Sequence, residues 1–392
     1  MFSHRTGWNL SQNRYSQAVE RCRAGQRPLL DLTASNPTAV GLHYDPELLS
    51  ALANPAALAY TPDPRGLLSA REAVCRYYAD RGDQVNVEQI ILTTSTSEGY
   101  TFVFRLLCNP GDEVLVPSPS YPLFDFLADL QDVHLQPYPL FYDHGWHIDI
   151  CALRERITER TRAIILVHPN NPTGSFIKAS ESAELNALCR EHNLALLTDE
   201  VFLDFPHHPP NSGLDRSLDR SFVSNRQVLT FTLSGLSKIA GLPQMKFSWI
   251  AVSGPDNAVR DALSRLELIA DTYLSMNAPI QLAAPAFFES RRSFQAQLKS
   301  RIATNLAELD RQLVPQPLCS RLEIEAGWYA VLRVPATRSD EDLAIELLEN
   351  EGVLVHPGHF YDFRSDGYLV VSLISPQADF QQGMQSIIEA AS

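Results

Sequence analysis

The sequence predicts an α/β fold: a large domain with a mostly parallel, seven-stranded sheet flanked by helices, and a smaller α+β domain. Between about residues 85 and 255, short apolar runs alternate with helical stretches. Several runs are almost continuously apolar, as strands buried on both faces should be. This alternation is typical of a doubly wound sheet. The candidate strands are 89–94, 113–117, 133–138, 163–168, 194–198, 228–233 and 247–252.

Helical stretches at 98–107 and 179–191 separate strands of this sheet. Beyond about residue 257 the pattern changes to long helices followed by short strands. The helices are 257–275, 285–313 and 340–350, and the strands are 322–324, 329–334, 353–356 and 369–373. A further helix, 12–24, lies near the N-terminus. We therefore expect residues 46–275 to form the large domain, and residues 1–45 and 276–392 together to form the small one.

Composition limits the classes of function. The 392 residues carry a formal net charge of −14 at pH 7, which argues against nucleic acid as a partner because such binders need a basic surface. No apolar run approaches the ~20 residues of a transmembrane helix, so no membrane partner is expected. The six cysteines are scattered singly, and the N-terminus lacks the apolar run of a secretory signal. We therefore expect a cytoplasmic protein.

Motifs for several other chemistries are missing. No G-x-G-x-x-G follows a strand, and there is no H-E-x-x-H. The pair His207-His208 has no accompanying carboxylate or cysteine cluster, so no metal site is expected. Ser175 and Lys178 match the S-x-x-K pattern of serine acyl enzymes, but the S-D-N and K-T-G elements of that set are absent.

Polar segments follow four of the candidate strands, at the end where α/β sheets place ligand sites. They bring a lysine, an acid, an amide and a helix N-terminus to one edge of the sheet. The segments are Ser95-Thr-Ser-Glu98, Asn170-Asn-Pro-Thr-Gly174, Asp199-Glu200 and Ser234-Gly-Leu-Ser-Lys238.

This combination suits pyridoxal phosphate. The cofactor needs an amine for an imine bond, an acid that keeps its ring nitrogen protonated, a phosphate cradle and an aromatic side chain against its ring. Burial at a strand end can lower the pKa of a lysine such as Lys238 and make its amine a usable nucleophile and base. A helix N-terminus with hydroxyl residues binds phosphate readily.

Across nearly its whole length the sequence resembles the class I/II aminotransferase family of fold type I. Each motif is weak alone, but their order and spacing together are specific. The motifs are Tyr60-Thr-Pro-Asp-Pro-Arg-Gly66, Pro110-Gly-Asp-Glu-Val114, Pro119-Ser-Tyr-Pro122, Asn170-Asn-Pro-Thr-Gly174, Asp199-Glu-Val201, Ser237-Lys238 and Pro357-Gly358.

The resemblance implies a role for each matching residue. Lys238 would form the Schiff base with the cofactor and move the substrate proton, and Asp199 would pair with the pyridine nitrogen. Asn171 would donate to the ring oxygen, and Tyr121 would stack on the ring. The phosphate would lie at Ser95 and Thr96. Tyr60 would reach the phosphate of a second subunit, which implies a homodimer with shared sites.

Three positions depart from the family's pattern near the cofactor. Phe202 stands where the family usually has tyrosine, so the phenol that assists the ring oxygen is missing. Lys246 replaces an arginine and would bind phosphate as a point charge. Gly235 replaces a serine, so Ser234 or Ser237 is expected to contact the phosphate instead.

The largest departure concerns the substrate. Val370 stands where the family has the arginine that grips the substrate α-carboxylate. Either another arginine replaces it or the substrate differs. Arg364, six residues upstream on an expected active-site loop, is the candidate replacement, although a solvated loop arginine is the alternative. Asn36, in a turn-rich segment, is a further candidate for substrate binding. The sequence does not identify the substrate.

Three functions remain to be distinguished. The first is an aminotransferase that moves an amino group between an amino acid and a 2-oxo acid. The second is a pyridoxal-phosphate lyase or decarboxylase on the same fold, which would release product without an amino acceptor. The third, a cofactor-binding protein with little catalysis, is disfavoured by the presence of both Lys238 and Asp199.

Overall fold

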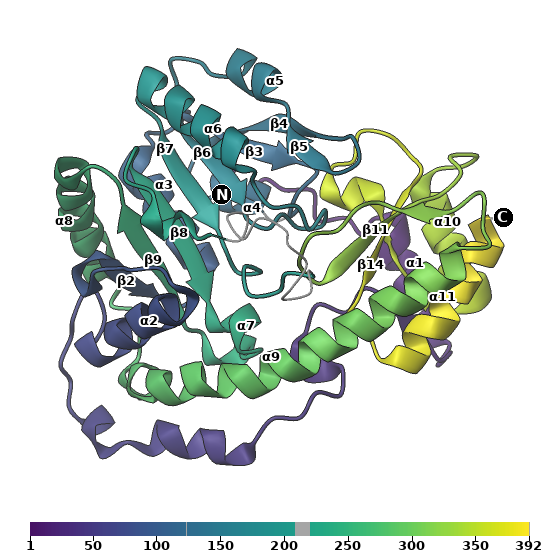
Figure 1. Ribbon diagram of the computed structural model, residues 1–392, viewed down its shortest axis with the longest axis horizontal. Coiled ribbons are helices and arrows are strands. Elements are labelled where there is room, and N and C mark those ends of the chain that lie inside the picture. Colours follow the sequence, from purple (N-terminus) through teal and green to yellow (C-terminus); the bar gives the residue numbers. More distant parts are fainter. Residues whose placement is uncertain (123, 208–219, 392) are drawn as a thin grey trace.

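The structure is a computed structural model that describes residues 1–122, 124–207 and 220–391, so His208 of the histidine pair lies outside the described residues. Its centre is an eight-stranded sheet with the strand order β2-β9-β8-β7-β6-β3-β4-β5 (Figure 1). The strands are β2 (Ile90–Thr93), β9 (Ser248–Ser253), β8 (Thr230–Gly235), β7 (Ala195–Asp199), β6 (Thr161–Val167), β3 (Glu113–Ser118), β4 (His134–Tyr142) and β5 (Trp146–Ile148).

The prediction of seven strands was one strand short. The first seven correspond to the predicted runs, and the eighth is the three-residue hairpin strand β5, which pairs antiparallel with β4. The sequence did not reveal β5 because three residues are too few to show the alternation of apolar and polar side chains that indicates a strand. The sheet is mostly parallel as predicted: within it, only β9, which is antiparallel to both neighbours, and β5 run against the rest.

Successive residues along each strand point to opposite faces of the sheet, and they pack into a separate hydrophobic core on each face. Ile165 on β6 packs with helices α3 (Thr96–Leu107) and α8 (Asp256–Tyr273), whereas its neighbour Ile164 packs with α6 (Ala179–His192). Helix α3 lies unusually close to the sheet at Gly99, where an added Cβ would stand 2.2 Å from Leu233 Cδ2. This close approach brings the first turn of α3 to the ends of the central strands.

The remaining helices of this body lie around the sheet. Helix α2 (Leu68–Arg81) packs against β2 and β9 together with the first turns of α9 (Ala278–Leu313). Shorter helices are α4 (Phe124–Asp129), α5 (Ile150–Glu155) and α7 (Leu236–Ile239). Among the described residues, no helix is both long and apolar enough to cross a membrane.

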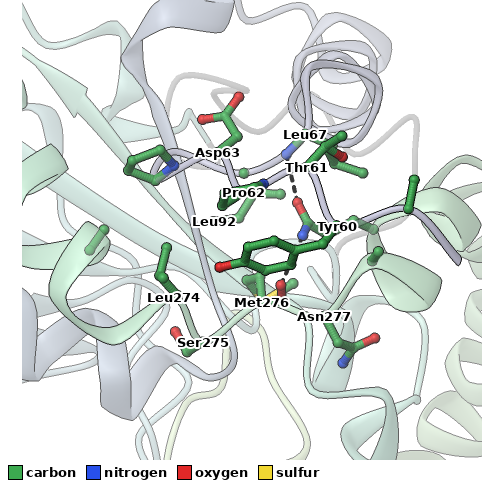
Figure 2. Close-up of a pocket in the computed structure, with 16 residues that line it drawn as sticks. Tyr60, Thr61, Pro62, Asp63, Leu67, Leu92, Leu274, Ser275, Met276 and Asn277 are labelled. Carbon is green, nitrogen blue, oxygen red and sulfur yellow. Dashed lines mark hydrogen bonds between the residues drawn. The ribbon is translucent and has the colours of Figure 1, made fainter. Parts of the chain in front are cut away.

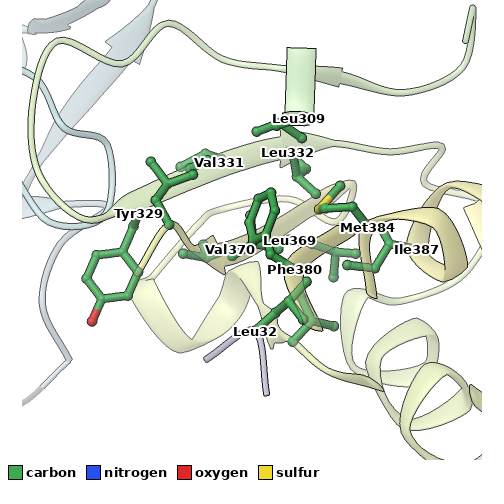
Figure 3. Packing of buried hydrophobic residues seen from close by; sticks show 14 of the residues in the cluster. Leu32, Leu309, Tyr329, Val331, Leu332, Leu369, Val370, Phe380, Met384 and Ile387 are labelled. Atoms are coloured by element: carbon green, nitrogen blue, oxygen red, sulfur yellow. The ribbon is translucent and has the colours of Figure 1, made fainter. Parts of the chain in front are cut away.

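A separate small sheet has the order β10-β11-β14-β13 and is antiparallel throughout. Its strands are β10 (Ser320–Arg321), β11 (Tyr329–Arg333), β14 (Tyr368–Ser372) and β13 (His356–Pro357), and helices α10 (Asp340–Glu346), α11 (Gln377–Ala391) and α1 (Arg14–Ala24) surround it. Figure 3 shows its core, where Phe380 and Met384 of α11 pack on Leu332 and Leu369.

The N-terminal segment joins this small body. Strand β1 (Leu30–Asp31) pairs in parallel with β12 (Val353–Leu354), and the hydroxyl of Tyr15 donates to the carbonyl of Val355 at 2.9 Å. Figure 1 accordingly shows purple α1 among the green and yellow C-terminal elements. Helix α9 contributes to the cores of both bodies, so the boundary at residues 275 and 276 stays a prediction.

Candidate active site

Lys238 lies in α7, directly after β8, where the chain leaves the sheet. Its Nζ donates to the carbonyl of Ser35 at 3.3 Å and lies 4.8 Å from the ring centre of Trp328 and 5.6 Å from that of Phe202. Burial lowers the pKa of Lys238 to about 8, and the charge of Asp199 opposes part of that shift. The amine is therefore partly uncharged near neutral pH.

Asp199, the last residue of β7, is buried and holds two hydrogen bonds. Its Oδ2 accepts from the hydroxyl of Tyr100 at 3.1 Å and its Oδ1 from the backbone N–H of Val201 at 3.1 Å. Burial raises the pKa of Asp199 to about 6, while both hydrogen bonds and Lys238 act in the opposite direction. Most of the carboxylate is therefore ionised at neutral pH, and its two hydrogen bonds and Lys238 offset only part of the cost of burying its charge. A positively charged partner would offset more of that cost.

The sequence interpretation missed Tyr100. Its position four residues after Thr96 places both on one face of α3, and that spacing is the signal that could have found it. The role itself depends on how closely α3 approaches β7, which no local pattern shows.

The segment 170–174 is a tight turn. Asn170 accepts from the N–H and hydroxyl of Thr173, and Gly174, at a φ of +70°, lies so near the backbone of Ala326 that an added Cβ would stand 2.3 Å from its carbonyl oxygen. Unlike Asn170, Asn171 does not hold the turn together: its Oδ1 is buried and has no hydrogen-bond partner among the described residues. A ligand or an ordered water would supply the missing donor to this buried oxygen.

The N-terminus of α3 is open to an anion. Ser95 caps the helix by accepting from the N–H of Glu98 at 3.1 Å, and the carboxylate of Glu98 turns back to the N–H of Thr94 at 2.7 Å. The N–H groups of Thr96 and Ser97 form no hydrogen bond to another described residue. Free amides at a helix N-terminus attract phosphate.

Ser234 and Ser248 lie beside this helix end. Ser234 Oγ is buried without a partner in the described chain. Gly235 pairs with Ser248 across β8 and β9, and a Cβ at Gly235 would stand only 2.3 Å from Ser248 Oγ. Ser248 Oγ therefore lies next to the place where a side chain at position 235 would be, and the sequence interpretation did not name this residue.

Two other predicted phosphate contacts are more open. Ser237 is partly exposed in α7. Lys246 is exposed, and its backbone φ of +50° is in the left-handed region. A lysine seldom adopts that conformation, which costs on the order of 1 kcal/mol and is more common at functional sites.

Tyr121 follows β3 and is 39% exposed. Its ring meets that of Phe124 edge to face, with centroids 5.8 Å apart, and Phe124 in turn meets Tyr100. Burial, and next the charge of Asp199, raise the pKa of Tyr121, so its ring lies within electrostatic reach of that carboxylate. One face of the tyrosine is available to a planar ligand.

Tyr60 is 81% exposed, and its pocket is lined by none of Lys238, Asp199, Asn171 and Tyr121. It lines a separate pocket of about 210 Å³ (Figure 2), where its ring lies near Met276. Gln281 closes the pocket by accepting from the N–H of Leu67 at 2.6 Å and donating to the carbonyl of Met276 at 3.0 Å.

The two substrate candidates have different surroundings. Asn36 adjoins Ser35, the residue that accepts from Lys238, but its Oδ1 is used by the N–H and hydroxyl of Thr38. Arg364 is exposed on the loop before β14. Val370 is buried in the core of the small body (Figure 3).

The alternative chemistries have no support at these positions. Lys178 is bound to Glu325 and Ser175 to Thr173, so the two do not form a nucleophile and its base. Among the described residues, no group of three histidine, cysteine, aspartate or glutamate side chains could hold a metal ion.

The assembled residues fit pyridoxal phosphate. The side-chain amide of Asn171, which forms no hydrogen bond with a described residue and whose NH2 can donate, the unpartnered Ser234 Oγ, the ionised Asp199 and the uncharged fraction of Lys238 are the amide, hydroxyl, acid and amine that the cofactor needs. They come from the ends of three neighbouring strands, β6, β7 and β8, so the fold and not local sequence brings them together.

Known proteins resemble this chain over most of its length. The sequence model described as aminotransferase class I and II matches residues 9–385. The glutamate–pyruvate aminotransferase AlaA of Escherichia coli is 32% identical over 90% of this chain and 87% of its own. An alanine aminotransferase of Mycobacterium bovis is 28% identical over 90% and 83%. A solved aminotransferase structure from Escherichia coli superposes with a TM-score of 0.83 at 25% identity, covering 96% of this chain and 94% of that one.

Proposed function

The chain belongs to the class I and II aminotransferase family and moves an amino group between an amino acid and a 2-oxo acid, and we propose that it does so with pyridoxal 5′-phosphate bound at Lys238. One observation carries the proposal. The partly uncharged amine of Lys238 and the buried carboxylate of Asp199 lie within electrostatic reach of each other at adjacent strand ends, beside the unpartnered amide of Asn171.

Lys238 supplies the amine and the proton relay. With a pKa of about 8, roughly a tenth of its amines is uncharged at pH 7, enough to form the covalent bond to the cofactor and to act as a base. Once bound, the cofactor would withdraw electrons from the substrate Cα, which no side chain of the protein can do. Nζ of Lys238 would then take the Cα proton and return it to the product.

Asp199 and Asn171 would orient the ring. Since the pKa of Asp199 is about 6, its carboxylate is mostly ionised at pH 7 and would stabilise a proton on the pyridine nitrogen. Asn171 would donate to the ring oxygen. It would do so without help from a tyrosine hydroxyl, because position 202 is a phenylalanine. Tyr121 would cover the ring face and exclude water from it.

The phosphate would lie at the N-terminus of α3. The proposed ligands are the free N–H groups of Thr96 and Ser97, the hydroxyls of Thr96, Ser95, Ser234 and Ser237, and the ammonium of Lys246. Ser248 Oγ, opposite Gly235, is added to this set from the geometry.

We also propose a homodimer, in which Tyr60 contacts the phosphate bound to the partner subunit. The proposal is supported by the exposure of Tyr60 and of two further apolar side chains: Leu58 is 93% and Leu268 70% exposed. Side chains of this kind favour a protein interface. Residues 46–275 are proposed as the cofactor domain, with residues 1–45 and 276–392 as the small domain. The cytoplasm is the proposed compartment, with which six unpaired cysteines are compatible.

The test is to trap the cofactor on the protein. After incubation with pyridoxal phosphate and borohydride reduction, mass spectrometry should locate the added mass on Lys238, and Lys238→Ala should remain unlabelled. Lys299, which is exposed and is not among the proposed ligands of the cofactor, is the internal control. Labelling elsewhere, with Lys238 unmodified, would refute the assignment.

Incubation with L-glutamate and pyruvate should next yield 2-oxoglutarate and alanine in equal amounts. These two substrates are chosen because AlaA, named above, is a glutamate–pyruvate aminotransferase. Release of CO2 or ammonia without an amino acceptor would instead favour the lyase.

A further inference from the structure

The small sheet presents one face to Lys238. Residues opposite each other on antiparallel strands point to the same side, and so do residues two apart on one strand. By this register Tyr329, Val331, Val370, Ser372 and His356 share a face.

Hydrogen bonds show that this shared face borders the active site. Ser372 Oγ donates to the carbonyl of Ala34 at 2.6 Å, and the next carbonyl, that of Ser35, accepts from Nζ of Lys238. From the other side, the ring of Phe202, which lies against Lys238, meets the ring of Tyr329 with centroids 6.3 Å apart. Tyr329 is therefore separated from the amine by only one aromatic ring.

Tyr329 carries an unused hydroxyl in this position. Its side chain is 93% buried, and its hydroxyl forms no hydrogen bond with the residues that the structure describes. In Figure 3 its ring points away from the packed side chains of Leu332, Phe380 and Met384, with the hydroxyl outermost. Burial and then the nearby Tyr121 raise its pKa, so the phenol keeps its proton and acts as a donor.

The polar neighbours Tyr121, Tyr361 and His356 carry no positive charge, and the carboxylate of Asp31 lies within electrostatic reach of Tyr329 and His356. Tyr361 and His356 are hydrogen-bonded to each other at 3.0 Å, and burial lowers the pKa of His356 to about 4, which keeps the imidazole neutral. The carbonyl of Tyr361 accepts from the N–H of Ser120, next to Tyr121. Within residues 1–122, 124–207 and 220–391, no arginine or lysine is hydrogen-bonded to Tyr121, Tyr329, Tyr361 or His356.

We propose that the hydroxyl of Tyr329 binds the carboxylate of the amino-acid substrate, so that this enzyme recognises the carboxylate with a neutral donor instead of a guanidinium. The inference rests on the proposed function, because it places the substrate between Lys238 and the small sheet. A phenol donating to a carboxylate forms a charge-assisted hydrogen bond. Val331 and Val370, on the same face, are apolar and buried, which strengthens such a bond by limiting the access of water.

The test measures binding with two ligands that differ only in the carboxylate. 2-Methylalanine and tert-butylamine have the same shape, and neither has a proton on the carbon that bears the amine, so neither can complete transamination. Their dissociation constants come from the absorbance change of the cofactor-loaded enzyme. The wild type should prefer 2-methylalanine.

Tyr329→Phe should raise the dissociation constant of 2-methylalanine about tenfold to a hundredfold. It should change the dissociation constant of tert-butylamine by less than about twofold. The matched control is Tyr15→Phe, which removes another buried hydroxyl from the same body and should leave both constants unchanged. Loading of the cofactor on each variant confirms that it is folded.

Three results would overturn the proposal. The first is equal affinity of the wild type for the two ligands, and the second is full retention of the preference in Tyr329→Phe. Loss of the preference in Arg364→Gln, with Tyr329→Phe unaffected, would assign the carboxylate to the loop arginine instead. A wild-type protein that takes up no cofactor at all would refute the proposed function and this inference together, a result that the trapping experiment separates from the other three.

Discussion

The buried hydroxyl of Tyr100 donates a hydrogen bond to Oδ2 of Asp199 and thereby joins helix α3 to the end of strand β7. The same helix holds Ser95 and Thr96 at its N-terminus. One helix therefore positions both the proposed phosphate site and the acid proposed for the ring nitrogen. A displacement of α3 would disturb the two together.

Tyr100→Phe should raise the pKa of Asp199 above about 6, because the lost hydrogen bond is one of the interactions that hold it down. Less of the carboxylate would be ionised at pH 6, so kcat/KM should fall about tenfold there and less at pH 8. The measurement is the acid limb of the pH profile of kcat/KM. Tyr138→Phe, whose buried hydroxyl bonds the carbonyl of Ile165, is the control. An acid limb that stays in place would contradict the role given to Tyr100.

Gly235→Ala should crowd Ser248, since the new Cβ would stand 2.3 Å from its Oγ and 3.0 Å from the carbonyl of Phe247. Overpacking of this kind costs about 1–3 kcal/mol, and the displaced hydroxyl should also weaken binding of pyridoxal phosphate. Thermal unfolding and cofactor titration measure the two effects.

The double variant Gly235→Ala, Ser248→Gly removes the obstructing side chain and is the matched control. It should recover most of the stability but not the affinity for the cofactor. If it recovered the affinity as well, Ser248 would have no part in the phosphate site.

The strands of the large sheet were predictable because burial on both faces makes several of them almost continuously apolar, as in residues 163–167 of β6. Placing polar residues at the ends of such strands was enough to bring Lys238, Asp199 and Asn171 together. Tyr100 and Ser248 were missed because their roles depend on distances between elements: α3 to β7 in the first case, and β8 to its antiparallel neighbour β9 in the second. Neither distance can be predicted from the pattern of the local sequence.

Glu200 should make the protein less stable as the pH rises. It is buried, accepts from the hydroxyl of Ser221 and the N–H of Phe222, and burial raises its pKa to about 8. In the unfolded chain the same group loses its proton near pH 4.5, its ordinary value. Between these two values the folded form retains a proton that the unfolded form has released, so the free energy of unfolding falls with pH across this window and levels off above it.

Glu200→Gln keeps the shape and removes the titrating group. It should flatten the pH dependence of unfolding between pH 5 and pH 8 and stabilise the protein at pH 8 by up to a few kcal/mol. Urea unfolding at a series of pH values measures this slope. Glu184→Gln, on the exposed face of α6, is the control and should leave the slope unchanged. An unaltered slope in Glu200→Gln would mean that the folded protein holds Glu200 ionised.

A mixing experiment tests whether Tyr60 acts across a dimer. Lys238→Ala and Tyr60→Ala each damage one component of the site, and each variant alone should have little activity. In a mixed dimer, one site would combine the intact Lys238 of one chain with the intact Tyr60 of the other, while the second site would carry both defects. Random mixing makes half of the dimers mixed, so unfolding and refolding the variants together should restore about a quarter of the wild-type activity. If Tyr60 served the site of its own chain, neither site of a mixed dimer would be intact, and the activity would stay at the mean of the two variants.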